Sequence, residues 1–218
     1  MYKVENVDLT EQAYVAVRNL ILTQELKPNQ KLYQEKLAER LGISRTPLLS
    51  AFAKLEREML LVYVQRRGYF VRSVTPEELI SIYEIRLRLE PLGAYEAAKV
   101  CDTAQIERLV KSLEALQELS PDAMLERFPS YDYEFHSVIM QMSGNEFLSK
   151  MMSSFNLIVL GNITGMYRDI QDSLKEHGLI LEALKHGDTK TVEKAMYNHI
   201  VVAKKRIAQQ TSEKKSHE

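Results

Sequence analysis

The chain has 218 residues, of which 45% are hydrophobic and 27% charged, with only 8 glycines and 6 prolines. This composition excludes a disordered, collagen-like or low-complexity chain and leaves room for one large domain or two small ones. No apolar stretch approaches the roughly 18 residues of a membrane span, and the first residues resemble no secretory signal. The single cysteine, Cys101, excludes an internal disulfide. We therefore expect a cytoplasmic protein without membrane contact.

The formal net charge is only −1, which taken alone argues against nucleic-acid binding, but the charges are unevenly distributed. Residues 1–73 carry 12 basic against 8 acidic side chains, whereas residues 74–218 carry 17 against 22. A basic surface on one small domain suits phosphate binding, because each neutralised phosphate releases counterions. This uneven distribution of charge favours a nucleic-acid-binding head, residues 1–73, followed by an acidic body, residues 74–218. The alternative is that the difference in charge arose by chance.

The first part of the head predicts three helices. Apolar residues at helical spacing predict the first over residues 9–25, with Asp8 as its cap. A short second helix ends at Gly42, and Ser44 is placed as the N-cap of a third helix. A tight, glycine-containing turn between two helices is typical of a helix-turn-helix unit.

Two short runs of β-branched and aromatic residues, 61–64 and 69–72, follow the third helix. They predict a β-hairpin whose tip carries Arg66 and Arg67. Three helices followed by such a hairpin are the plan of a winged helix, in which the wing meets phosphates or a minor groove. A small α+β packing domain with solvated arginines is the alternative.

Residues 75–78, Thr-Pro-Glu-Glu, are a strong helix start, so we place the domain boundary here. Beyond it we find only helical periodicity. The predicted helices cover roughly residues 76–99, 103–119, 121–127, 130–143, 145–168, 172–186 and 189–210. The expected fold class is therefore mainly α, with a winged helix-turn-helix over 1–74, an all-helical antiparallel bundle over 75–210 and a disordered tail over 211–218.

Four side chains of the body suit a metal ion. Asp132 and His136 are four residues apart on one predicted helix and therefore project from the same face. His177 and His199 come from the last two predicted helices, which an antiparallel bundle can bring together. One carboxylate and three imidazoles suit a divalent ion such as Zn, Ni, Mn or Co with one or two positions left open. Scattered surface or core histidines are the alternative.

The ordered set of motifs resembles the GntR family of transcription regulators, in its FadR-type branch with an all-helical FCD effector domain. In the head the resemblance is carried by Leu37-Ala38, Leu41-Gly42-Ile43-Ser44-Arg45-Thr46-Pro47, Ala51, Leu55-Glu56 and Gly68-Tyr69-Phe70-Val71. In the body it is carried, in order, by Tyr83-Glu84-Ile85-Arg86, Leu89-Glu90, Asp132, Phe135-His136, Gly144-Asn145, Glu176-His177, Gly187-Asp188 and His199.

The resemblance implies a homodimeric, cytoplasmic DNA-binding regulator, and not an enzyme. A small carboxylate metabolite bound in the helical domain would change how two winged-helix heads hold a near-palindromic, double-stranded operator. In this branch the matching positions commonly hold a divalent transition metal, so the resemblance implies a metal site at Asp132, His136, His177 and His199. Arg86 is then expected to clamp the anionic effector, because its planar fork matches a carboxylate. A salt bridge to Glu90, four residues along the same helix, is the alternative for Arg86.

The expected DNA-binding residues are Arg45, Ser44, Thr46, Arg66, Arg67, Gly68, Arg18 and Lys36. Arg45 begins the recognition helix and is the expected reader of a guanine edge, with neighbouring hydroxyls on phosphate oxygens. Arg66 and Arg67 would contact phosphate or the minor groove from the wing. For Arg18 and Lys36, a solvated charge is an equally good interpretation.

Three positions depart from the family pattern. Leu49 stands where arginine is usual, so a DNA contact is exchanged for an apolar group, and operator affinity or sequence is expected to differ. Asn29 and Met59 stand where glycine is usual. Asparagine tolerates a left-handed backbone and methionine does not, so we expect the turn at Met59 to take another shape.

Two other functions use the same four metal-site residues. In a metal sensor the ion itself would be the effector. In a hydrolase or lyase the ion would activate water, but no general base or nucleophile can be named beside the site, and an enzyme has no use for a winged head.

Overall fold

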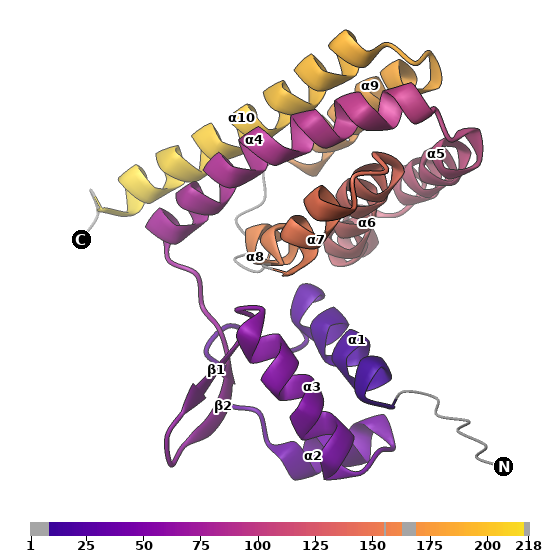
Figure 1. The fold of residues 1–218 in the computed structure, drawn as a ribbon. Coiled ribbons are helices and arrows are strands. Elements are labelled where there is room, and N and C mark those ends of the chain that lie inside the picture. Colours follow the sequence, from indigo (N-terminus) through magenta and orange to yellow (C-terminus); the bar gives the residue numbers. More distant parts are fainter. Residues whose placement is uncertain (1–8, 155, 163–168, 216–218) are drawn as a thin grey trace, which may run out of the picture. The chain divides into compact units, whose positions relative to one another are not determined.

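The computed structural model describes residues 9–154, 156–162 and 169–215. The chain divides into two compact units, Met1–Ser73 and Val74–Glu218, which we call the head and the body (Figure 1). The head contains α1 (Leu9–Leu22), α2 (Gln34–Leu41), α3 (Arg45–Arg57), β1 (Leu61–Val64) and β2 (Gly68–Val71). The predicted fold class, helices with one small hairpin in the head, is confirmed. The predicted cap Asp8 lies outside the described residues.

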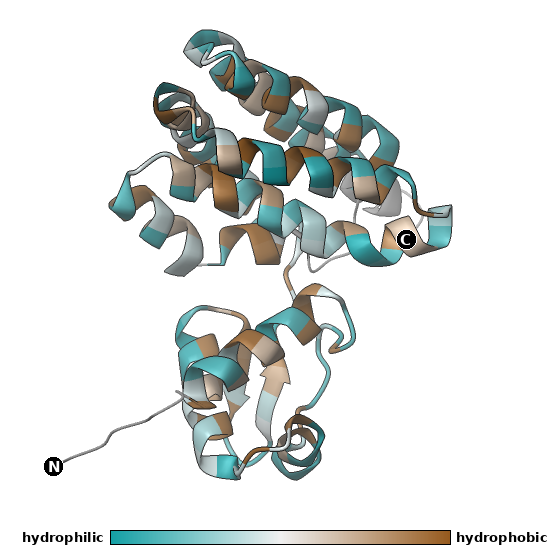
Figure 2. Cartoon of the chain, turned by 90° about the vertical axis from the view of Figure 1, so that its right-hand side faces the viewer, coloured by the Kyte–Doolittle hydropathy of each residue, from teal (hydrophilic) through white to brown (hydrophobic). Residues whose placement is uncertain are grey.

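The head is held together by the apolar faces of its helices. Val17 and Ile21 of α1 and Phe52 and Leu55 of α3 are fully buried, and α1 packs against α3. Brown and teal positions alternate around these helices in Figure 2, the pattern of amphipathic helices with one face in a core. Between α2 and α3 the chain turns at Gly42, whose φ of +66° is the left-handed geometry that glycine adopts readily.

The hairpin is joined to the helices through a third backbone segment. Strands β1 and β2 pair antiparallel, with Leu61 opposite Val71. The amide of Leu32 donates to the carbonyl of Tyr69 at 2.9 Å, and the amide of Val71 donates to the carbonyl of Gln30 at 3.0 Å. The link between α1 and α2 therefore anchors the base of the wing.

The chain leaves α3 through a left-handed residue at Met59, so the expectation of another shape at this turn is wrong. Met59 has a φ of +64°, the same as Asn29. The amide of Met59 donates to Glu56 at 3.0 Å and that of Leu60 donates to Leu55 at 2.9 Å, which is a Schellman motif. Because Leu55 and Leu60 are both fully buried, their packing outweighs the roughly 1–2 kcal/mol that left-handed backbone costs a residue with a Cβ.

The body consists of helices throughout its described residues. They are α4 (Pro76–Val100), α5 (Thr103–Gln117), α6 (Pro121–Met142), α7 (Glu146–Ser154), α8 (Leu157–Asn162), α9 (Ile170–Lys185) and α10 (Thr189–Lys215). The predicted capping box starts α4: the amide of Glu78 donates to the Thr75 hydroxyl at 3.2 Å, and the amide of Thr75 donates to the Glu78 carboxylate at 2.9 Å. Helices α4 and α10 run side by side (Figure 1). None of the described helices is long and apolar enough to cross a membrane.

The structure corrects three predicted helix boundaries. Pro129 does not divide residues 121–143, because α6 continues through it; buried side chains on both sides, including Phe128 and Phe135, outweigh the cost of an interior proline. The predicted helix 145–168 is instead α7 and α8, separated where Asn156 takes a φ of +46°, and residues 163–168 lie outside the described part. Helix α10 extends to Lys215, so only 216–218 of the expected tail lie beyond it, outside the described residues.

Replacing Met59 by glycine is expected to stabilise the head by about 1 kcal/mol, because glycine adopts the left-handed backbone without steric cost. Urea unfolding of the full chain, with hydrogen exchange of head peptides as the readout, measures the change. Met59→Ala is the matched control, since it also removes the side chain but keeps the Cβ. Equal stability of the glycine and alanine variants would contradict this explanation of the turn.

Candidate functional site

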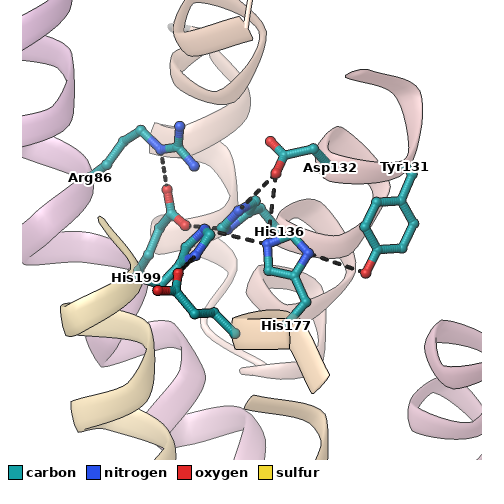
Figure 3. Close-up of polar contacts among 8 residues, drawn as sticks. Arg86, Tyr131, Asp132, His136, His177 and His199 are labelled. Atoms are coloured by element: carbon teal, nitrogen blue, oxygen red, sulfur yellow. Dashed lines mark hydrogen bonds and ion pairs between the residues drawn. The ribbon is translucent and has the colours of Figure 1, made fainter. Parts of the chain in front are cut away.

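Three helices of the body bring the predicted metal ligands together in its interior. Asp132 and His136 lie one turn apart on α6, His177 lies on α9 and His199 on α10 (Figure 3). All four side chains are buried, and one ligand atom from each lies within 4.8 Å of the others. The sequence prediction that these residues converge is therefore realised in the structure.

The inward-facing atoms of the cluster are arranged as donors to a common centre. The Nε2 atoms of His177 and His199 lie 3.3 Å apart, and Asp132 Oδ1 lies 3.5 Å from His136 Nε2 and 3.7 Å from His177 Nε2. Within the described part of the chain, neither nitrogen of the fully buried His136 makes a hydrogen bond, and Glu90 Oε2 makes none either. Nδ1 and Glu90 Oε2 form an ion pair at 2.5 Å, whereas Nε2 faces the centre of the cluster. Buried polar atoms normally have a partner, and a divalent cation among three imidazoles and a carboxylate would supply one. The residues present therefore fit a metal.

The outward-facing nitrogens of the three imidazoles are each held by another side chain. His136 Nδ1 lies 2.5 Å from Glu90 Oε2, His177 Nδ1 lies 3.1 Å from the Tyr131 hydroxyl, and His199 Nδ1 lies 2.8 Å from Glu176 Oε2. Partners of this kind orient metal-binding histidines so that the second nitrogen faces the ion. The ring of His177 also stacks on Phe135, with centroids 3.8 Å apart.

Sequence reasoning assigned no role at the cluster to Tyr131, Glu176 or Glu90. Tyr131 precedes the predicted ligand Asp132, but adjacent helical residues do not share a face, so their adjacency gave no signal. Glu176 precedes His177 yet holds His199 from across the bundle. Glu90 and Glu176 both stand in motifs that carry the family resemblance, and Glu90 was also expected as the alternative partner of Arg86, four residues before it.

The charges of the side chains in the cluster compensate one another. Burial lowers the pKa of His136, but the negative charges of Glu90 and Asp132 outweigh burial and raise it to about 9. Burial raises the pKa of Glu90, but the charges of Arg86 and His136 outweigh it and bring it to about 2. Burial and the neighbouring His199 hold the pKa of His177 well below its usual range. The His136 imidazolium and the Arg86 guanidinium thus balance the two carboxylates of Glu90 and Asp132 at neutral pH.

Arg86 is enclosed near the cluster and is only 2% exposed. Its Nε makes an ion pair with Glu90 Oε1, and its guanidinium carbon lies 4.8 Å from the centre of the Tyr83 ring. A Cβ at Gly161 would lie 2.7 Å from Arg86 Nη1, so the glycine gives the guanidinium its room. The salt bridge predicted as the alternative for Arg86 is present.

A cavity of about 660 Å³ lies between α9 and α10 and reaches the edge of the cluster. His199 and its partner Glu176 are among its lining residues, whereas Arg86 is not. A smaller cavity of about 150 Å³ lies along α6, α7 and α8 and is not lined by any of the four metal-site residues. Solvent therefore approaches the cluster from the side of His199.

The predicted recognition residues of the head lie at the start of α3. Ser44, Arg45 and Thr46 are exposed, and Ser44 is the N-cap residue, although its side chain makes no capping hydrogen bond. Arg45 makes an ion pair with Glu35 of α2. Leu49, one turn further, is 38% exposed, so the apolar group does stand on the outer face of this helix.

The other predicted DNA-binding residues fall into two groups. Arg66 and Arg67 are exposed at the wing tip, where Arg66 has a φ of +64°, Gly68 has a φ of +91° and the Arg67 guanidinium lies 5.3 Å from the Phe70 ring. Lys36 is exposed on α2. Arg18 is instead half-buried, with its guanidinium 5.5 Å from the ring of Tyr14. Lys36 and Arg18, the two residues with the weakest indication of DNA binding in the sequence, therefore differ: Lys36 is exposed to solvent and Arg18 is partly covered.

Two family models match the chain. Residues 9–71 match the model for bacterial regulatory proteins of the gntR family, and residues 81–201 match the FCD domain.

Known bacterial regulators are similar to this chain over most of their own length. The HTH-type transcriptional regulator YdhC of Bacillus subtilis is 27% identical over 199 residues, covering 86% of this chain and 87% of that protein. The HTH-type transcriptional repressor GlaR of Escherichia coli is 24% identical over 201 residues, covering 86% and 90%. Among solved structures, Escherichia coli McbR/YncC superposes with a TM-score of 0.81 at 23% identity, covering 94% of this chain and 100% of that chain, which supports the fold.

Proposed function

Because the chain belongs to the GntR family of bacterial transcription regulators and carries an FCD domain, we propose that it is a repressor controlled by a small carboxylate metabolite bound at a metal ion in the body. It is a DNA-binding transcription regulator and not an enzyme, so the hydrolase or lyase alternative falls away. Repression is supported by relatives named as repressors, among them GlaR and the gluconate operon repressor of Bacillus licheniformis.

The observation that carries this proposal is the buried cluster of one carboxylate and three imidazoles with no hydrogen bond to His136 Nε2 among the described residues. Asp132, His136, His177 and His199 would hold a divalent transition metal such as zinc, nickel or manganese. When bound, such an ion supplies a Lewis-acidic centre for a carboxylate or hydroxyl oxygen. Glu90, Tyr131 and Glu176 keep the three imidazole rings turned toward it.

The carboxylate of the effector is proposed to contact Arg86 as well, because the guanidinium lies beside the cluster. A guanidinium can donate two parallel hydrogen bonds to one carboxylate. An effector changes DNA binding only if it binds differently to the gripping and the released arrangement of the heads. Two heads in a homodimer would meet two half-sites of a near-palindromic operator.

A metal sensor is the second candidate function. It is favoured by one observation: Arg86 is already paired with Glu90 and lines neither cavity described above, so the ion alone is a possible effector. Titrating DNA binding with metal alone, and then with metal and carboxylates together, separates the two functions.

Protein purified without chelator is expected to contain about one metal ion per chain by elemental analysis. His136→Ala and His177→Ala are expected to contain none, because each removes one of the four proposed ligands and weakens binding enough for the ion to be lost during purification. His186→Ala is the matched control, since His186 is 71% exposed on the same hairpin of helices as His177. Metal absent from the folded wild type, or retained in full by both ligand variants, would contradict the site.

Arg45→Ala is expected to weaken binding to the DNA upstream of the protein's own gene by about 1–3 kcal/mol and to relax preference at one base pair. Arg66→Ala should weaken binding to all sequences alike and lower the salt slope by about one. Arg57→Ala, near the other end of α3, is the control. Fluorescence anisotropy over a range of salt concentrations measures all three, and equal effects of Arg45→Ala and Arg57→Ala would contradict the assignment of Arg45.

Arg86→Met is expected to keep the metal and lose the response of DNA binding to carboxylates, because the anion loses its bidentate partner. The test screens a panel of small mono-, di- and hydroxycarboxylates against DNA binding of the metal-loaded protein. Arg88→Met, at an exposed position two residues along α4, is the control. An unchanged carboxylate response in Arg86→Met would remove this residue from the effector site.

A further inference from the structure

Glu90 stands between the two groups on which the proposed function rests, the guanidinium of Arg86 and the metal ligand His136. We propose that Glu90 is a positioning residue that allows a buried arginine and a divalent cation to share one helical bundle. One of its carboxylate oxygens holds the His136 ring in the orientation of a ligand, and the other neutralises Arg86. This inference rests on the metal site proposed above.

The geometry gives each oxygen of Glu90 a different partner. Arg86 and Glu90 lie one turn apart on α4, and Arg86 Nε pairs with Glu90 Oε1. Glu90 Oε2 lies 2.5 Å from Nδ1 of His136, which comes from α6. Glu90 and His136 are both 0% exposed, and α4 packs against α6. The three side chains therefore form one buried row from the guanidinium to the metal cluster.

The first consequence concerns the orientation of His136. An imidazole offers a metal only one of its two nitrogens, and the partner of the other nitrogen decides which one faces inward. With Nδ1 against Glu90, the Nε2 of His136 faces Asp132 at 3.5 Å. A neutral amide in place of the carboxylate would hold the ring less firmly and make it a weaker donor.

The second consequence concerns charge. Like charges repel strongly in a dry interior, so a fully buried guanidinium disfavours a dication in the same bundle. The carboxylate of Glu90 lies between Arg86 and His136 and offsets this repulsion. Removing only the charge of Glu90 would leave the arginine uncompensated next to the metal site.

The two other imidazoles provide a comparison within the same site. His177 is held by the neutral hydroxyl of Tyr131, and His199 by Glu176, which is 25% exposed at the cavity between α9 and α10. Solvent screens the charge of Glu176, whereas nothing screens that of Glu90. Removing the charge of Glu176 should therefore loosen one ring without exposing the metal site to Arg86.

The test measures Co²⁺ and Zn²⁺ affinities of the full chain by competition with a chromogenic chelator. Glu90→Gln is expected to weaken metal binding about 10- to 100-fold. Adding Arg86→Met to Glu90→Gln should recover part of this loss, because it removes the uncompensated cation. The matched pair is Glu176→Gln with and without Arg86→Met, where the second substitution should bring no comparable recovery. The visible absorption of bound Co²⁺ should change in Glu90→Gln and remain that of the wild type in Arg86→Met.

Several outcomes would overturn the inference. A folded Glu90→Gln that binds Co²⁺ with wild-type affinity and spectrum removes Glu90 from the metal site. Equal recovery by Arg86→Met in the Glu90→Gln and Glu176→Gln backgrounds overturns the charge argument.

Two further arms cover loss of folding and loss of the site itself. If Glu90→Gln does not fold, the double variant Arg86→Met/Glu90→Gln carries the test, since it leaves no unpaired charge, and it must bind metal more weakly than Arg86→Met. If the wild-type protein binds no metal, the proposed metal site is wrong. If the wild type binds metal and Glu90→Gln binds it with the same affinity, only the role proposed for Glu90 is wrong.

Discussion

Charge compensation in the interior of the body is the constraint on which the rest of the bundle depends. Helices α4, α6, α9 and α10 bury an arginine, two carboxylates and three imidazoles, groups that globular proteins rarely bury without partners. Each of these groups has an opposite charge or a polar partner within reach, so the cluster is tolerable without a metal. Among the described residues, His136 Nε2 makes no hydrogen bond, and a cation at the centre of the cluster would give it a partner.

The same constraint explains why the site draws on so many helices. A single helix face can supply Asp132 and His136, but it cannot also supply the groups that turn the rings inward. Glu90 comes from α4, while Glu176 comes from α9 and holds a ring of α10. The four proposed metal ligands and their partners thus tie four helices to one another, so a metal bound there would bear on the packing of the whole bundle.

The fold, Asp132 and His136 could be predicted because their signals are local: apolar periodicity, Gly42 after a short helix, the capping box at Thr75, and the i, i+4 spacing of the two metal-site candidates. His177 and His199 lie on other helices, and they joined the set through the expected antiparallel bundle and the family resemblance. The errors arose where tertiary packing decided against local preference. Pro129 stays within α6 and Met59 takes a left-handed backbone because buried neighbours hold both in place. The partnership of Glu176 with His199 was out of reach, since no spacing rule connects residues on different helices.

Helix α4 carries Arg86 and Glu90, and its first residue, Pro76, follows the boundary between head and body by only two residues. A continuous helix is stiff, and the ten residues from Pro76 to Arg86 span about 15 Å. A tilt of about 10° around Arg86 would therefore displace the helix start by about 3 Å. A small adjustment at the buried charges would in this way become a displacement at the point where the chain passes into the DNA-binding head.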